Sequence, residues 1–153
     1  MKKVSILLLL LVVLSGCSWG LTGDRGGGLI HTIQSESVRT VNPEAVFSSE
    51  DFRTAENITA ESIAENKGHQ VVLAQIKDRE QFHVHDRHDL LVMLKDGEGF
   101  LRTKTQTVQV KPGDWAIVPR GVPHQFVTTS EKPARAVVVR TPPVKKDRRP
   151  VKR

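Results

Sequence analysis

Most apolar residues of this chain fall in short runs separated by turn residues, and few of them recur at helical spacing. Runs rich in β-branched and other apolar residues cover 70–76, 90–94, 115–118, 125–128 and 134–140. Runs of this length bounded by glycine, proline or asparagine are typical of β-strands. Many short strands without a long helical pattern predict an all-β barrel or sandwich.

Local signals refine this pattern. Asn42-Pro43-Glu44 is suited to begin a short helix that runs through Phe47, because asparagine caps helices well and proline fits the first helical position. The apolar residues of 58–64 fit neither period cleanly, and an edge strand is favoured over a helix. Asn66-Lys67-Gly68 predicts a turn, and Gly97 predicts a hairpin turn that leads into a returning strand at 100–103.

The first residues have the organisation of an export signal. A charged start is followed by the apolar run Val4–Leu14, which is too short to span a bilayer. The closing Leu-Ser-Gly-Cys resembles a bacterial lipobox, which implies that residues 1–16 are a signal peptide and that Cys17 is lipidated. The alternative is a chance cysteine after an ordinary signal peptide. Ser18 after the cysteine resembles the outer-membrane address, so we expect a lipid-anchored protein of the bacterial cell envelope, facing the periplasm.

Composition divides the rest of the chain into three parts. Glycine-rich polar sequence predicts a flexible tether at 17–41, and the strand-rich segment 42–142 predicts the folded domain. The segment 143–153 holds six basic residues against one aspartate, which predicts a disordered tail, with weak contact to anionic lipid as the alternative. We expect no nucleic-acid partner for an exported protein. Cys17 is the only cysteine, so no internal disulfide can form.

Histidines gather at the start of one apolar run. In an extended chain, the side chains of His83 and His85 point to the same face about 6–7 Å apart, close enough to share one ion. Trp115–Val118 is expected to be a buried strand, and the turn Pro119–Pro123 after it delivers His124. Three imidazoles brought together would form a site for a divalent transition metal such as Fe, Zn, Mn, Ni or Cu.

These two stretches resemble the two sequence motifs of the cupin superfamily, G-x5-H-x-H-x(3,4)-E-x6-G and G-x5-P-x-G-x2-H-x3-N. The second motif is matched by Gly113, Pro119, Gly121 and His124, with Thr128 in place of the asparagine. The first motif is matched by His83, His85 and Gly97. Its leading glycine is replaced by Lys77, and its glutamate is absent.

The resemblance implies a small jelly-roll barrel with His83, His85 and His124 as metal ligands inside it. Asp89 and Leu90 are the two positions where the missing glutamate could fall. Asp89 is a candidate catalytic residue, for which we expect a role next to the metal rather than coordination. His88 is a candidate acid or base at the mouth of the pocket, with solvent exposure as the alternative.

The leading functional prediction is a lipid-anchored, metal-binding cupin that holds a small molecule in its barrel. Whether it is an enzyme stays open at this point, since the fold does not choose a function. A metal-dependent dioxygenase-like oxidoreductase or an isomerase are the enzymatic candidates, and a non-catalytic binding or sensory module is the alternative. The run Leu90–Leu94 is apolar on both faces and therefore needs a cover on its outer side. The cover is either a strand layer from the N-terminal segment or a second subunit, and we expect a homodimer.

Overall fold

A computed structural model describes residues 28–152 of the chain. The predicted signal peptide and Cys17 lie outside the described residues. The larger of two facing layers is a five-stranded antiparallel sheet. Its strands, in spatial order, are β3 (Ile58–Glu65), β4 (Gln70–Ile76), β11 (Ala134–Thr141), β6 (Asp89–Asp96) and β9 (Trp115–Val118). The expected edge strand at 58–64 is confirmed, and so is the turn at Asn66, whose Oδ1 accepts hydrogen bonds from the backbone of Gly68 and His69.

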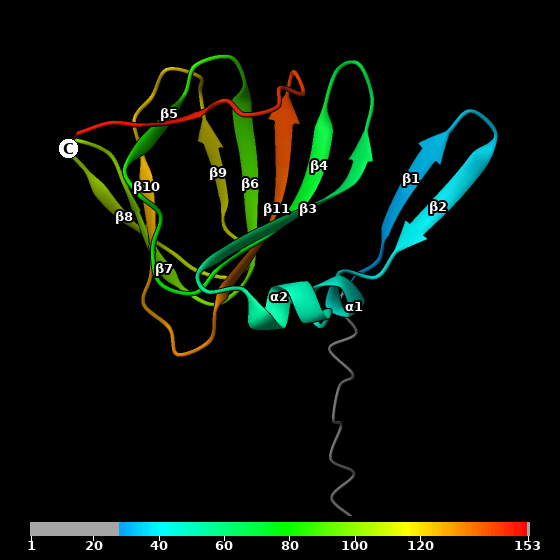
Figure 1. Ribbon diagram of the computed structural model, residues 1–153, viewed down its shortest axis with the longest axis horizontal. Helices are drawn as coiled ribbons and strands as arrows, with labels where there is room; N and C mark the ends of the chain where they lie inside the picture. Colours follow the sequence, from blue (N-terminus) through cyan, green and yellow to red (C-terminus); the bar gives the residue numbers. More distant parts are fainter. Residues whose placement is uncertain (1–27, 153) are drawn as a thin grey trace, which may run out of the picture.

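The second layer consists of shorter strands. β10 (Gln125–Thr128), β7 (Gly99–Arg102) and β8 (Thr107–Val110) form one sheet, and β5 (His83–His85) pairs with β12 (Arg148–Pro150). A backbone bridge between His83 and His124 places β5 beside the start of β10. The layers face each other as a small barrel (Figure 1), so the all-β prediction is confirmed.

Apolar side chains from both layers fill one end of the barrel. Leu94, Val110 and Ala134 form a buried cluster there, with Leu101 and Phe126 packed against it. The alternation of strand side chains directs these residues inward. The histidines lie at the opposite end, so the packed cluster closes the bottom of the barrel and leaves its other end for the site.

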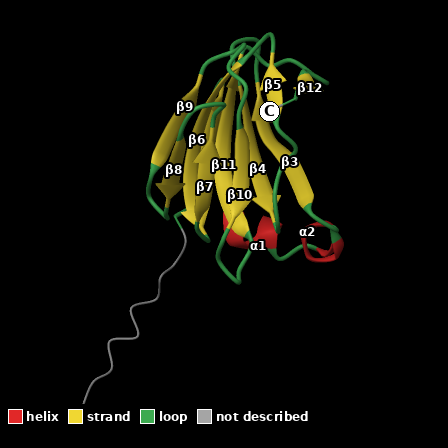
Figure 2. Cartoon of the chain, turned by 90° about the vertical axis from the view of Figure 1, so that its left-hand side faces the viewer, coloured by secondary structure: helices red, strands yellow, loops and turns green. Residues whose placement is uncertain are grey.

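Two short helices, α1 (Pro43–Phe47) and α2 (Glu50–Thr54), cover part of the outer face of the larger sheet (Figure 2). The predicted cap is confirmed, because Asn42 Oδ1 accepts a hydrogen bond from the backbone of Glu44. Phe47 and Phe52 are fully buried and pack edge to face against each other, with Leu73 of β4 in the same cluster. The sequence analysis missed α2, although two acidic residues in its first turn are a recognised helix-start signal.

The prediction of a flexible tether is wrong for the part of 17–41 that the structure describes. β1 (Ile30–Gln34) and β2 (Ser37–Val41) form an antiparallel hairpin that projects from the side of the barrel (Figure 1). Arg39 anchors it by donating a hydrogen bond to the carbonyl of Ile63 on β3. The hairpin has apolar contacts with the domain through Val41, which lies in the same cluster as Phe47, and through Ile30, which packs against that cluster. Within residues 28–152, no helix is long and apolar enough to cross a membrane.

Two further expectations about strands need correction. Gly97 adopts a positive φ of 74°, but the turn carries the chain from β6 in one layer to β7 in the other rather than closing a hairpin. A Cβ on Gly97 would lie 2.8 Å from the Pro133 carbonyl, so the close approach of this turn to the start of β11 requires glycine. β9 is an edge strand and not a buried one: Trp115 and Ile117 are 64% and 75% exposed.

The prediction of a disordered basic tail is wrong for residues 148–150. This segment is β12, and it runs back across the histidine end of the barrel to pair with β5 (Figure 1). Arg149 makes two hydrogen bonds to Asp86, and Asp147 is buried with only 8% of its surface exposed. Composition showed an excess of positive charge. The carboxylates that pair with this segment, on Asp86 and Glu80, lie 63 and 68 residues earlier in the chain than their arginine partners, and sequence alone cannot pair them.

Candidate metal centre

The backbone of β5 and the turn before β10 are fixed to each other. The amide of His83 donates to the carbonyl of His124 at 2.9 Å, and the amide of His124 donates back to His83 at 2.8 Å. The amide of Gly121 donates to the carbonyl of His85 at 2.7 Å, and Gly121 has a positive φ of 79°, which favours glycine in this turn. The turn therefore places the third histidine beside the first two, as the sequence predicted.

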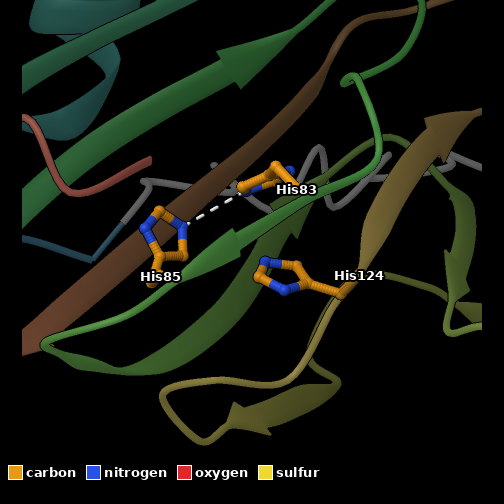
Figure 3. A group of neighbouring side chains, drawn as sticks. All are labelled: His83, His85 and His124. Atoms are coloured by element: carbon orange, nitrogen blue, oxygen red, sulfur yellow. Dashed lines mark hydrogen bonds between the residues drawn. The ribbon is translucent and has the colours of Figure 1, made fainter. Parts of the chain in front are cut away.

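The side chains of His83, His85 and His124 converge from these elements (Figure 3). All three are buried, and their ligand nitrogens lie within 4.8 Å of one another. The Nε2 atoms of His83 and His85 are 3.2 Å apart, and the ring centroids of His83 and His124 are 4.4 Å apart. The predicted cluster is therefore present, with the spacing that one shared ion requires.

Hydrogen bonds to the backbone determine which nitrogen each ring presents. The Nδ1 of His83 donates to the carbonyl of Gln81 at 2.8 Å, and the Nδ1 of His124 donates to the carbonyl of Val122 at 2.9 Å. The proton on Nδ1 leaves a lone pair on Nε2, and in both rings that atom faces the cluster. Ring N–H groups held by carbonyls are the usual support of metal-ligating histidines. This donor set fits a divalent transition metal.

The histidines are kept neutral by their surroundings. Burial, followed by the nearby His124 and Arg148, lowers the pKa of His83 to about 4. Burial, followed by the neighbouring His88 and His83, lowers the pKa of His85 to about 3. Burial also lowers the pKa of His124. Neutral imidazole is the form that binds a metal, so the site is ready to accept an ion at neutral pH.

A second group of donors lies behind His85. The ring of His88 packs against that of His85 with a centroid distance of 4.4 Å, and its Nδ1 is 3.0 Å from a carboxylate oxygen of Asp147. Both His88 and Asp147 are buried. The expected location of His88 at the pocket mouth is wrong, and so is solvent exposure, because the ring lies behind a ligand and does not line the cavity. The ring of His88 does not reach the cavity, so His88 could act as an acid or base only by passing a proton through His85.

Asp89 lies away from the three histidines. Its carboxylate forms a two-pronged ion pair with Arg120, and it accepts a further hydrogen bond from the Arg120 backbone. Those hydrogen bonds lower the pKa of Asp89 to about 2. Asp89 belongs to neither group of possible ligands and does not line the cavity. Its expected role next to the metal stays a prediction without support from the geometry.

A cavity of about 180 Å³ extends from the histidines into the barrel. Its walls are mainly aliphatic, from residues such as Leu90, Val92 and Val138. An engineered cavity of about 150 Å³ binds benzene, so this space holds a group of about that size. Sequence reasoning missed the charged residues of the lining: Glu80, Asp114, Arg140 and Arg148. Arg140 and Arg148 lie outside the histidine motifs, and only a count of inward positions on β11 could have indicated Arg140.

Glu80 is the one acidic side chain of the lining near the histidines. Burial raises its pKa, although the charge of Arg148 and a hydrogen bond from the Phe126 backbone oppose that rise. Arg148 lies 3.4 Å from Glu80 and 3.4 Å from the Nδ1 of His83. Since that Nδ1 already donates to Gln81, the contact between Arg148 and His83 is a packing contact rather than a second hydrogen bond.

Comparison with known proteins supports the same fold. The family described as "Cupin domain" matches residues 70–140. An uncharacterised protein of Aquifex aeolicus is 39% identical over 59 residues, which are 39% of this chain and 49% of that protein, so the match spans about half of the relative's length.

Among solved structures, the chain is similar to ectoine synthase from P. lautus, with a TM-score of 0.58 and 18% identity over 73% of this chain and 88% of that one. It is also similar to KdgF from Halomonas sp., with a TM-score of 0.55 and 18% identity over 60% of this chain and 84% of that one. Identities this low show the fold alone. Residues 70–140 therefore match the cupin domain family, and the part of the chain that the structure describes has a mostly β-strand cupin fold.

Proposed function

We propose that this protein binds one divalent transition metal through His83, His85 and His124 and holds a small molecule beside it in the barrel. The observation that carries the proposal is the convergence of three buried, neutral imidazoles at one end of an apolar cavity. His83 and His124 both direct an Nε2 lone pair toward the cluster, and these lone pairs repel each other. A cation bound between the two rings removes that repulsion.

Three histidines leave coordination positions open, which suits a site that acts on a ligand more than a structural site. A bound metal would supply a Lewis acid that polarises an oxygen of the ligand. The aliphatic walls of the cavity exclude water from the site. The buried Asp147 and its neighbours close the space behind His85. Metal-dependent oxidative cleavage is the leading reaction, since an open site admits both oxygen and a second ligand.

A non-catalytic binding or sensory module is the second candidate. The observation that favours it is the position of the two predicted catalytic residues, because neither His88 nor Asp89 lines the cavity. Among the described residues near the histidines, Glu80 is the acidic side chain that could move a proton to or from a ligand there. An enzyme is therefore expected to depend on Glu80, whereas a binding module is not.

Oxygen uptake by the iron-loaded protein with a panel of small acids and phenols tests the choice. The enzyme proposal expects uptake that stops in His124→Ala and falls at least about 100-fold in Glu80→Gln, the lower range for removal of an acid or base. Saturable binding of panel compounds without uptake would support the binding module.

We further propose that the protein works at the bacterial cell envelope, anchored through a lipid on Cys17, and that it forms a homodimer. The anchor is supported by the sequence at the N-terminus, and the dimer by the exposed apolar residues on the outer face of the larger sheet. Trp115 and Ile117 are exposed there beside Leu91 and Met93, with which they pair across β9 and β6.

A further inference from the structure

One half-buried cation of the cavity lining has no anionic counterpart among residues 28–152. Arg140 stands on β11, directly opposite Leu90 of β6, and its side chain lines the cavity at the histidine end. No carboxylate of residues 28–152 lies within ion-pair distance of its guanidinium, and burial lowers its pKa. Charges removed from water are ordinarily paired, because desolvation of a lone charge is costly.

The other charged residues of the lining do not fill this role. Arg148 forms an ion pair with Glu80, and the charges of these two side chains cancel. Asp114 lies at the far end, where its backbone carbonyl accepts a hydrogen bond from Leu94. Leu94 is four residues along β6 from the partner of Arg140, which is about 13 Å in an extended strand. The positive charge near the histidines therefore belongs to Arg140.

The hydrogen bonds of Arg140 leave one edge of the guanidinium free. Its Nη1 donates to the side-chain oxygen of Gln70 at 3.1 Å. Its Nε is buried and has no hydrogen-bond partner in the described part of the chain, and no hydrogen bond from Nη2 is formed there either. The Nε and Nη2 groups form the parallel pair of donors that matches the two oxygens of a carboxylate.

Arg140 lines the same cavity as the three histidines of the proposed metal site. Its positive charge is also one of the smaller causes, after burial, of the lowered pKa of His85. Beyond the guanidinium, the cavity continues as an aliphatic space of about 180 Å³ that ends at Leu94. A ligand that extends from the histidines into this space would place its polar end beside Arg140 and its apolar body against the aliphatic walls.

Building on the proposed function, we propose that the ligand of this barrel is a small carboxylate with a compact apolar body, and that Arg140 binds its carboxylate through the Nε and Nη2 edge. One guanidinium edge suits one planar monoanion, and the cavity volume suits one ring or short branched chain. The aliphatic walls favour the apolar body by removing its surface from water.

Calorimetric titration of the full-length protein with benzoate and with benzamide tests this proposal. The two probes have the same shape and differ in charge, and each is titrated into the metal-free and the metal-loaded protein. We expect benzoate to bind at least about tenfold more tightly than benzamide, in line with hydrogen bonds to a charged group. Arg140→Gln should remove at least about tenfold of the benzoate affinity and leave benzamide unchanged.

Two further variants guard the interpretation. Arg135 stands on the same strand as Arg140, but its guanidinium lies over the ring of Phe47 and outside the cavity lining. The variant Arg135→Gln should therefore bind both probes as the wild type does. Arg140→Lys keeps the charge without the paired donors and should recover part of the preference for benzoate.

Equal binding of the two probes by the wild type, no binding of benzoate at its highest soluble concentration, or an unchanged preference in Arg140→Gln would overturn the proposal. Metal content is measured separately on the same samples. A protein that loads metal but shows no preference for benzoate contradicts the carboxylate proposal alone. A protein that loads no metal but still prefers benzoate through Arg140 contradicts the metal site alone.

Discussion

Asp147→Asn should weaken both the fold and the metal site, although residue 147 is not one of the three predicted ligands. Its carboxylate accepts hydrogen bonds from the backbone amide of Arg87 at 2.9 Å and from the Arg87 Nε at 3.1 Å. It also lies 3.0 Å from the Nδ1 of His88, whose ring packs on His85. Asp147 is thus the link between the C-terminal segment and a histidine of the site.

The structure gives the size of the effect. Asparagine keeps the shape of the side chain but removes the charge from these buried contacts, and a hydrogen bond involving a charged group contributes about 1.5–3 kcal/mol to stability. We expect a loss of that order in the free energy of unfolding. Loss of a residue that supports a metal-ligating histidine typically lowers metal affinity about 10–100-fold. We expect this range, because His88 would no longer be held against His85.

Denaturant unfolding of the metal-free protein measures the first effect, and competition with a chromogenic chelator measures the second. Asp86→Asn is the matched control. Asp86 also pairs with an arginine of the C-terminal segment, Arg149, but both side chains of this pair are exposed. An exposed pair contributes about 0–1 kcal/mol, so this variant should bind metal normally. If Asp147→Asn keeps wild-type metal affinity, or if both variants lose it equally, the supporting role of Asp147 is wrong.

The pH dependence of stability and the dimer are further predictions from the structure, and the lipid anchor is a prediction from the sequence. Since burial lowers the pKa of His83 to about 4 and of His85 to about 3, the unfolded chain takes up protons below pH 6.5 that the folded metal-free protein does not. The free energy of unfolding should therefore fall as the pH decreases from 6.5 to about 4, and greater stability at pH 5 than at pH 7 in denaturant titrations would contradict this. Light scattering should give a dimer for the wild type and a monomer for the double variant Trp115→Glu and Ile117→Glu; a monomeric wild type would remove the dimer. In a bacterial host, the wild type should be lipid-labelled and Cys17→Ala unlabelled, and a wild-type protein recovered without lipid would show that the anchor is wrong.

The strands could be predicted from the sequence because their apolar runs are short and bounded by turn residues. The histidine cluster could be predicted because local geometry determines it: His83 and His85 share a face through strand alternation, and the Gly121 turn delivers His124. The helix at 43–47 was likewise predictable from its cap at Asn42.

The parts that could not be predicted depend on contacts between distant segments. Asp147 reaches the turn after β5 across 60 residues. Arg140 is exceptional only because no carboxylate of residues 28–152 pairs with it, which sequence cannot show. Trp115 and Ile117 are as apolar as core residues, and their exposure follows from the position of β9 at the sheet edge. Long-range pairing, and not local preference, decides each of these cases.

The most direct test of the account is the metal content of the purified full-length protein and four histidine variants, by elemental analysis after loading with a divalent transition metal and removal of free ion. The wild type should retain about one ion per chain. His83→Ala, His85→Ala and His124→Ala should each lower the metal affinity at least about tenfold, because two remaining imidazoles bind poorly. His69→Ala removes an exposed histidine that contacts Asn66 far from the cluster, and should retain the full ion content. A wild type without bound metal under every loading condition, or a His124→Ala variant with full occupancy, would contradict the three-histidine site.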